Sequence, residues 1–276
     1  MILEVSSEFT SSPYSGISPS NNSFLFNSLG LDDKKAALSY PKSMLDACDL
    51  EAFGYRIRKA SESPDNLTLE FAAHFYTPFT NWTHCELIIQ IDTDLDGQSD
   101  FELLGTDLHH LSHHTPPESM MSVLLDAELL REERKKRQAG LKVNTSKAIL
   151  SVEALYSPKN TGLMIVAVPL HKLSLKSSLV NLKFLSSLTR PGYGERDDFF
   201  KRHKKTWQKL SLLESEQSYR KQKESYQLKS GEIKTIFLEK GFLNNPLLLI
   251  FPYNKKNIFH AQKSKQVKVV YPRYLY

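Results

Sequence analysis

The chain of 276 residues is predicted to be all-β, an immunoglobulin- or jelly-roll-like antiparallel β-sandwich with a basic helical insertion. Three observations predict this class. Short segments rich in β-branched and aromatic residues recur along the chain, and turn-forming residues separate them. In LTLEFAAHF, residues 67–75, apolar and polar side chains alternate as they do in a half-buried strand.

The predicted strands follow one another at regular spacing through the middle of the chain. They cover residues 52–60, 66–76, 85–91, 100–105, 120–129, 147–156, 162–170 and 178–188. Turn sequences such as SPDN and SPKNTG separate them. LREERKKRQAG, residues 130–140, interrupts the series and is either an exposed charged loop or a short helix.

Composition divides the chain into four parts. Residues 1–40 are rich in Ser, Asn, Pro and Gly and are predicted to be a flexible segment. Residues 41–190 form the predicted sandwich. Residues 191–230 are charged and rich in helix formers, which predicts a basic helical insertion or linker. Residues 231–276 return to strand-like runs such as LLLIFPYN and form a C-terminal β segment.

An aspartate-rich loop, IDTDLDGQSD, separates two of the predicted strands. Carboxylates this close repel one another unless something neutralises them, and Ca²⁺ takes six to eight oxygen ligands of the kind that such a loop provides. With Asp92 as the first position, aspartates occupy positions 1, 3, 5 and 9, and glycine occupies position 6, where the chain must turn. The predicted calcium ligands are Asp92, Asp94, Asp96, the Gln98 carbonyl and Asp100.

The loop departs from the EF-hand pattern in two ways. Position 12 is Leu103 rather than a bidentate Glu, and strand-like segments flank the loop where an EF-hand has helices. The sequence therefore predicts a calcium-type loop between strands. An acidic, solvated hairpin without a metal is the alternative, although a hairpin has no need of alternating aspartates.

The net charge of +5 conceals two halves of opposite sign. Residues 1–130 carry 6 Lys or Arg against 20 Asp or Glu, a net charge of −14, and residues 131–276 carry 30 against 11, a net charge of +19. The acidic half contains the aspartate loop, which agrees with cation binding there. The basic half either packs against the acidic half or faces an anionic partner.

Two further clusters suggest sites of other kinds. His109 and His113, like His110 and His114, have the i, i+4 spacing that suits a transition metal on a helix, which makes His109 and His113 a hypothetical second metal site. A polar loop before two prolines is the simpler interpretation. An anionic-partner patch is predicted at Lys201, Arg202, Lys204, Lys205 and Trp207. A solvated face or a contact with the acidic half is its alternative, and nucleic acid is not the favoured partner.

Cysteine content and hydropathy limit location and chemistry. Cys48 and Cys85 are too few for a disulfide framework or a zinc site, and both one bridge and two free thiols fit the sequence. The longest apolar run is shorter than a membrane span, and the first residues do not have the pattern of a secretory signal. An extracellular or cell-envelope location is expected, with the leader absent from this chain, and a cytoplasmic location is the alternative.

The order of three segments resembles a known non-catalytic module. NLTLEFAAHF, ELIIQIDTDLDGQSDFELL and KAILSVEALYSPKNTGLMIVAVPL are similar to the β-sandwich that follows the catalytic domain in some secreted bacterial subtilisin-like serine proteases. The final PLLLIFPYN segment resembles the closing strand of that module. The basic insertion at 194–230 has no counterpart in that pattern. The glycine-flanked His and Ser motifs of the proteases themselves do not occur in the chain.

These observations predict a non-catalytic, calcium-binding module that is accessory to a secreted subtilisin-like protease or belongs to a surface protein. One alternative is an adhesin-like module that binds an anionic partner through its basic half. A minor alternative is a metal-dependent hydrolase that uses the histidine cluster at residues 109–114.

Overall fold

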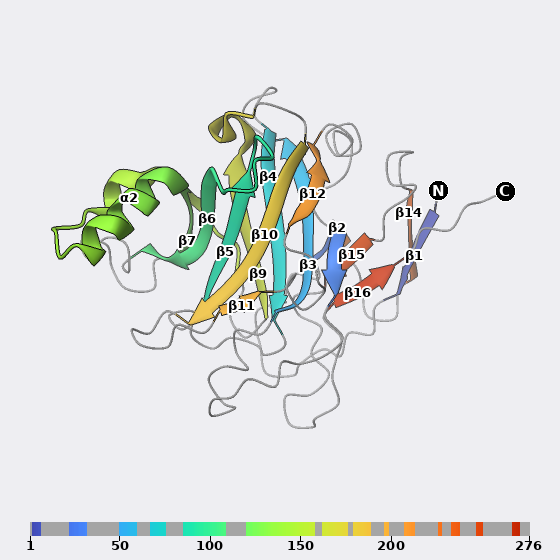
Figure 1. Ribbon diagram of the computed structural model, residues 1–276. Coiled ribbons are helices and arrows are strands. Elements are labelled where there is room, and N and C mark those ends of the chain that lie inside the picture. The colour runs from blue at the N-terminus through green and yellow to red at the C-terminus, as the bar shows by residue number, and fades with distance from the viewer. Residues whose placement is uncertain are drawn as a thin grey trace, which may run out of the picture.

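The computed structural model of the chain contains two antiparallel sheets that face each other across a shared apolar core (Figure 1). It describes residues 2–6, 22–31, 50–59, 67–75, 85–108, 120–157, 162–175, 179–188, 196–198, 207–212, 226–227, 233–237, 247–250 and 267–270. The described architecture is that of an all-β, sandwich-like protein, as the sequence predicts.

The first sheet contains the aspartate loop and has the strand order β11-β10-β5-β6-β7-β8, with β12 also paired to β10. Its strands are β5 (Cys85–Asp92), β6 (Phe101–Asp107), β7 (Met120–Asp126), β8 (Ile149–Ala154), β10 (Leu179–Leu188), β11 (Arg196–Asp198) and β12 (Gln208–Ser211). Strands β5 to β8 run as a meander, and β10 adds beside β5 from much later in the chain.

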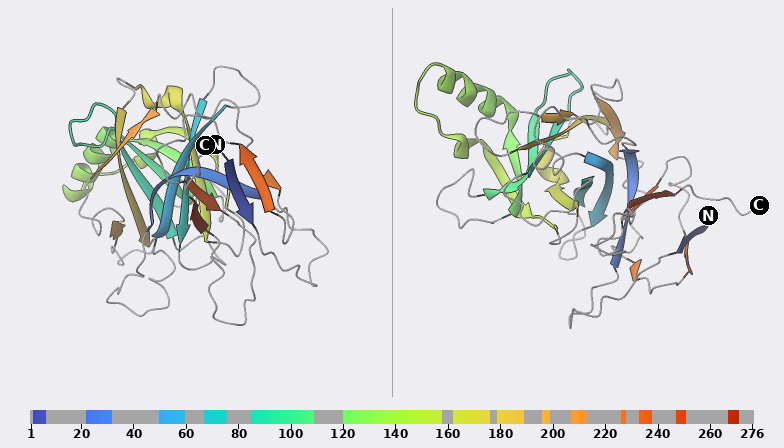
Figure 2. Two further views of the ribbon diagram at one scale, coloured as in Figure 1. Left: turned by 90° about the vertical axis from the view of Figure 1, so that its right-hand side faces the viewer. Right: turned by 90° about the horizontal axis from the view of Figure 1, so that it is seen from below.

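The second sheet has the order β16-β15-β2-β3-β4-β9, and β13 pairs with β2. Its strands are β2 (Asn22–Leu31), β3 (Leu50–Lys59), β4 (Leu67–Phe75), β9 (Leu163–Pro169), β13 (Tyr226–Gln227), β15 (Leu247–Ile250) and β16 (Val267–Val270). A separate ribbon pairs β1 (Ile2–Ser6) with β14 (Ile233–Phe237). Figure 2 shows this ribbon beside the second sheet, away from α2.

The core between the sheets follows from the alternation of side chains along each strand. Phe53, Phe71 and Phe75 of the second sheet and Leu87 and Ile89 of the first are among its fully buried side chains. Each such side chain stabilises the fold by roughly 1.5–3 kcal/mol through the apolar surface that it removes from water. The repeating inward positions explain why β-branched and aromatic runs predicted the strands correctly.

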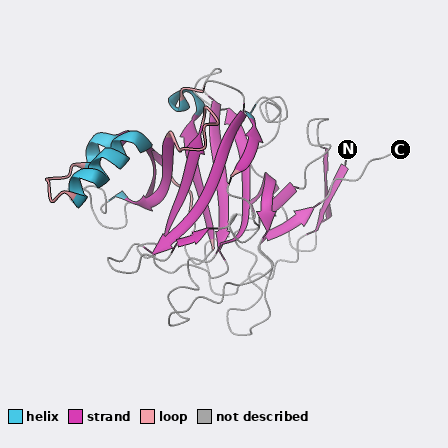
Figure 3. Cartoon of the chain, in the orientation of Figure 1, coloured by secondary structure: helices cyan, strands magenta, loops and turns pink. Residues whose placement is uncertain are grey.

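The outer face of the first sheet carries a second, smaller apolar cluster under helix α2 (Ala127–Gln138). Ile88, Leu104 and Val123 come from three neighbouring strands, and Leu130 of α2 packs on them. Figure 3 shows α2 at the side of the sandwich, with strands forming nearly all of the remaining described structure. The described residues also include two short 3₁₀ helices, η4 (Thr145–Ala148) and η5 (Leu170–Leu173).

Residues 130–140 were predicted to be either an exposed charged loop or a short helix, and the helix is confirmed, because α2 covers residues 130–138. Asp126 ends β7 and caps the helix, because its Oδ1 accepts from the N–H groups of Glu128 (2.9 Å) and Leu129 (3.0 Å). The predicted strand at 120–129 is therefore too long by three residues. At the other end, Gly140 has φ +72°, a left-handed conformation that commonly terminates a helix.

The predicted helical insertion is wrong for the residues of 191–230 that the structure describes. Strands β11, β12 and β13 lie there, and β12 pairs with β10 over Leu179 to Leu182. Leu210 and Leu212 are buried in the core and lie two residues apart, which is the period of a strand. Pairing with an available strand thus outweighs the helix propensity of the surrounding charged residues.

The N-terminal and C-terminal parts of the chain meet in the second sheet. β1 and β2 lie within residues 1–40, for which the sequence suggested a flexible segment. β2 pairs with β3 on one side and with β15 on the other. The C-terminal strands at 233–237, 247–250 and 267–270 agree with the predicted runs.

Candidate metal centre

The aspartate loop joins β5 to β6 at one end of the first sheet. β5 and β6 pair in register from Leu87 opposite Gly105 to Ile91 opposite Phe101. The N–H of Asp100 donates to the carbonyl of Ile91 at 2.8 Å and closes the base of the loop. The loop therefore begins and ends on two hydrogen-bonded strands, which fix the positions of its first and last aspartates.

Asp92 is the buried centre of the loop and is fully inaccessible to solvent. Its Oδ1 accepts from the N–H of Leu95 at 2.7 Å, and its Oδ2 accepts from the N–H of Gly97 at 2.9 Å. The backbone curls around this carboxylate by means of two left-handed residues, Leu95 at φ 67° and Gly97 at φ 87°. Leu95 adopts a backbone conformation that is uncommon for residues with a Cβ atom, and its hydrogen bond to Asp92 offsets the cost of that conformation.

Asp100 and Thr93 tie the two sides of the loop together. Oδ2 of Asp100 accepts from the N–H of Thr93 at 2.7 Å and from its hydroxyl at 2.6 Å. The two exposed aspartates accept hydrogen bonds from backbone N–H groups within the loop instead. Asp94 accepts from the N–H of Asp96 at 3.3 Å, and Asp96 accepts from the N–H of Gln98 at 2.7 Å.

Three of the predicted ligands come together in space. Asp92, Asp94 and Asp100 can each offer a carboxylate oxygen, and these oxygens all lie within 4.8 Å of one another. Oxygens that share one Ca²⁺ lie at most about 5 Å apart, because each is 2.3–2.6 Å from the ion. Asp96 is not part of this group, and Gln98 lies in the exposed part of the loop.

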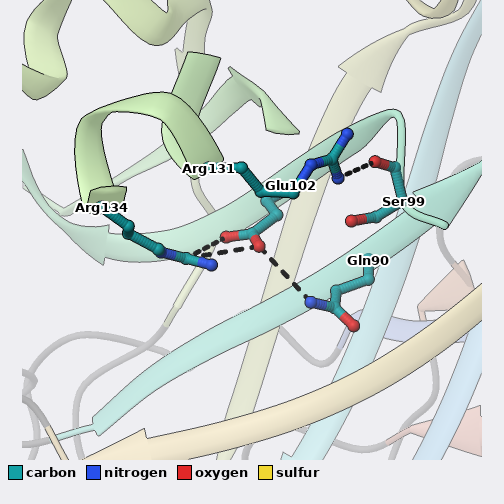
Figure 4. A network of polar contacts seen from close by, with 5 residues as sticks. All are labelled: Gln90, Ser99, Glu102, Arg131 and Arg134. Carbon is teal, nitrogen blue, oxygen red and sulfur yellow. Dashed lines mark hydrogen bonds and ion pairs between the residues drawn. The ribbon is translucent and has the colours of Figure 1, made fainter. Parts of the chain in front are cut away.

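Two arginines of α2 reach toward the loop and the strand that follows it. Arg131 donates from Nη1 to the carbonyl of Ser99 at 2.9 Å. Arg134 forms an ion pair with Glu102 of β6, with Nη2 3.2 Å from Oε2, and Gln90 of β5 donates to the other Glu102 oxygen at 3.4 Å (Figure 4). These contacts fasten α2 to the outer face of the sheet and bring positive charge beside the acidic loop.

Asn181 is a residue of the site that the sequence analysis missed. It lies in β10 directly opposite Asp92, and its Nδ2 donates to Oδ2 of Asp92 at 2.9 Å. Eighty-nine residues separate the two. Only the strand register brings them together, so no local sequence pattern predicts the contact.

The residues of the loop fit a hard divalent cation. Every carboxylate atom that could bind a metal at the site is an oxygen, which suits Ca²⁺, Mg²⁺ or Mn²⁺ rather than a metal that prefers sulfur or imidazole ligands. Asn181 provides a further, independent observation, because its Oδ1 is buried and has no hydrogen-bond partner. A cation beside Asp92 would satisfy such an oxygen.

The other predicted sites fall largely on residues that the structure does not describe. His109, His110, His113 and His114 lie outside the described residues, as do Lys201, Arg202, Lys204 and Lys205. Trp207 is described and is half-buried just before β12. The second metal site and the 201–207 patch therefore stay predictions.

Cys85, at the start of β5, is buried and disulfide-bonded. The sequence left open whether the cysteines are bridged or free. The other cysteine of the chain, Cys48, lies outside the described residues.

Comparisons with protein-family models, with curated proteins and with solved structures find no match to this chain. Among the described residues, no helix has both the length and the apolar character that a membrane span requires.

Proposed function

We propose that the chain is a non-catalytic, calcium-binding β-sandwich module with its ion at the β5–β6 connection. The observation that supports this most is the convergence of the Asp92, Asp94 and Asp100 carboxylates within 4.8 Å at a loop closed by two paired strands. Charges of one sign at this separation repel, and a divalent cation is the simplest group that turns the repulsion into attraction.

The role of the ion in this proposal is mechanical. Asp92 begins the loop and Asp100 ends it, so an ion bound to both fixes the connection between β5 and β6. Binding to the folded state alone stabilises that state by RT ln(1 + [Ca²⁺]/Kd). With a dissociation constant of roughly 10⁻⁴ to 10⁻³ M, as in extracellular modules, 10 mM Ca²⁺ contributes about 1.4–2.7 kcal/mol.

Thermal unfolding with calcium and with a chelator tests the proposal. We expect calcium to raise the melting temperature of the whole chain by roughly 3 to 10 °C. Asp94→Asn should reduce this increase by about half or more, because it removes one charge from the group while it preserves the shape of the side chain. Glu132→Gln, an exposed residue of α2, is the matched control and should leave the increase intact. Equal melting curves with calcium and chelator would reject the proposal.

The accessory role of the module and its cellular location are proposed on separate grounds. The resemblance to modules of subtilisin-like proteases supports an accessory role beside a catalytic domain or in a surface protein. The disulfide at Cys85 supports an extracellular or cell-envelope location, because disulfides persist mainly in oxidising compartments. Detection of the chain in the culture medium or envelope fraction of its source, in oxidised form, tests the location.

An adhesin-like role is the second candidate, and the surface of α2 favours it. From Ala127 to Ala148 the chain carries seven Lys or Arg against three Glu, and Lys135, Arg137, Lys142 and Lys147 are exposed. A surface of this charge attracts an anionic glycan, and the attraction weakens with salt. Retention on heparin that falls when Arg137 and Lys142 are both changed to Gln would support this role, and unchanged retention would reject it for α2.

A further inference from the structure

Asn181 occupies an unusual position for a polar residue. Val180 and Leu182, its neighbours in β10, both belong to the core, so alternation directs Asn181 to the opposite face of the first sheet. The side chain is nevertheless only 7% exposed. On that face Asn181 lies opposite Asp92, the most deeply buried aspartate of the loop.

Only half of the Asn181 amide is satisfied. Nδ2 donates to Oδ2 of Asp92 at 2.9 Å, whereas Oδ1 is buried with no hydrogen-bond partner. An unpaired buried acceptor costs about 1–3 kcal/mol. Both polar atoms are bonded to the same carbon, so the unpaired oxygen lies close to the Asp92 carboxylate.

We propose that Asn181 is a cation ligand, supplied by β10 to the ion that the aspartate loop holds. This inference rests on the proposed function and deepens it. Rotation of the amide about its Cβ–Cγ bond exchanges Nδ2 and Oδ1 and places the oxygen beside Oδ2 of Asp92. Two acceptor oxygens in that arrangement repel each other, a cation in contact with both offsets the repulsion, and amide oxygens are ordinary ligands of Ca²⁺.

The consequence is a metal-linked contact between distant parts of the chain. Asp92 already accepts hydrogen bonds from Leu95, Gly97 and Asn181 out of about four lone-pair sites. Release of the Asn181 bond leaves two of these sites for the ion. The cation then joins the loop to β10, and through β10 to β12, so calcium stabilises the β5–β10 pairing as well as the β5–β6 connection.

The alternative is that Asn181 serves only to position Asp92 through its N–H group. Asn181→Asp separates the two roles, because it changes only the amide to a carboxylate of the same shape. As a ligand, the new carboxylate should tighten calcium binding about tenfold or more, and it should lower the melting temperature in chelator through repulsion from Asp92. As a positioning group alone, it should bind calcium no more tightly than the natural residue.

Calcium affinity is measured by calorimetric titration of the full chain and of three variants. Asn144→Asp, an exposed asparagine after α2, is the matched control for the added charge and should leave the affinity unchanged. Asn181→Leu removes both polar atoms and should weaken binding about tenfold. If Asn181→Asp fails to fold in chelator, recovery of its folded spectrum on addition of calcium supports the ligand role. If it folds in neither condition, Asn181→Leu decides: weaker calcium binding supports the ligand role, and unchanged binding overturns it.

The outcomes separate this inference from the proposed function. Calcium binding by the natural chain, with unchanged or weaker binding by a folded Asn181→Asp variant, overturns the inference and leaves the proposed function in place. No calcium binding by the natural chain overturns both.

Discussion

Arg131 of α2 donates from its guanidinium to the backbone carbonyl of Ser99, 2.9 Å away, within the aspartate loop. The residues are 32 positions apart. Together with the N–H of Ala127, which donates to the carbonyl of Asp100 at 3.0 Å, this contact joins the helix directly to the loop. It also places a positive charge near the carboxylates. The loop thus has a protein-supplied cation at its edge in addition to any metal that it binds.

Replacement of Arg131 by Met should destabilise the protein mainly when calcium is absent. Loss of a hydrogen bond from a charged group costs about 1.5–3 kcal/mol, and solvent screening reduces this at a half-buried site. Bound calcium would hold the loop independently, so the difference from the natural chain should shrink in its presence. Urea unfolding in chelator and in calcium measures both values. Lys135→Met on the same helix is the control, and an equal loss in the two conditions would contradict the prediction.

Arg56 and Glu70 form a buried ion pair between β3 and β4, with Nη2 and Oε2 2.6 Å apart. Removal of one partner deprives the other, still buried, charge of this ion pair and should cost up to about 3–5 kcal/mol. Replacement of both by Met should cost clearly less than the sum of the single changes, because neither charge then remains. A double-mutant cycle by urea unfolding provides the measurement. Additive losses would show that the two side chains act independently.

Glu133 connects α2 to the loop that follows it. Hydrogen bonds from Lys136 and from the N–H of Asn144 hold the pKa of Glu133 below its ordinary value of 4.5. A carboxyl with a lowered pKa contributes stability that is fully present above its unfolded value and is lost as the pH falls through the folded value. Glu133→Gln should therefore be less stable than the natural chain at neutral pH.

The difference between Glu133→Gln and the natural chain should begin to shrink as the pH falls below about 4.5, where Glu133 becomes protonated in the unfolded chain, and it should be lost as the pH falls through the lower pKa of the folded chain. Urea midpoints measured across this range test the dependence, with Glu132→Gln as the control. A difference that stays constant with pH would mean that the charge of Glu133 does not stabilise the fold.

Gly162 is required where the chain enters β9. A Cβ atom at this position would lie 2.5 Å from the backbone oxygen of Phe75, and the Gly162 carbonyl accepts from the Phe75 N–H at 2.8 Å. Backbone atoms cannot move aside as a side chain can. Gly162→Ala should therefore destabilise the fold by about 1–3 kcal/mol, measured by urea unfolding. Ala154→Gly, at an exposed position in β8, is the control, and a Gly162→Ala protein as stable as the natural chain would contradict so close an approach of the two backbones.

Much of the fold is predictable from sequence, because its strands bury one face and show this in their residue pattern. The predicted bounds of β4 and β5 agree with the structure within one residue at each end, since their inward positions repeat every second residue. β2 was missed because its sequence, NSFLFNSLGL, is rich in residues typical of turns, and its partners β3 and β15 provide the pairing that defines it.

The candidate site was predictable only where it is local. Asp92, Asp94 and Asp100 belong to one loop, and their spacing predicted that they would converge. Asn181 and Arg131 reach the loop from β10 and α2, and these contacts depend on strand register and helix packing rather than on any local pattern. Strand β12, which contains Leu210, shows the same limit, because it forms by pairing with the distant β10.

A calorimetric titration of Ca²⁺ into the metal-free chain shows whether the aspartate loop binds calcium. We expect a single saturable site with a dissociation constant of roughly 10⁻⁴ to 10⁻³ M, weakened about tenfold or more by Asp94→Asn. Asp96→Asn should have a smaller effect, because Asp96 lies outside the group of converging carboxylates. Absence of saturable binding, or binding that Asp94→Asn leaves unchanged, would contradict a calcium site at this loop.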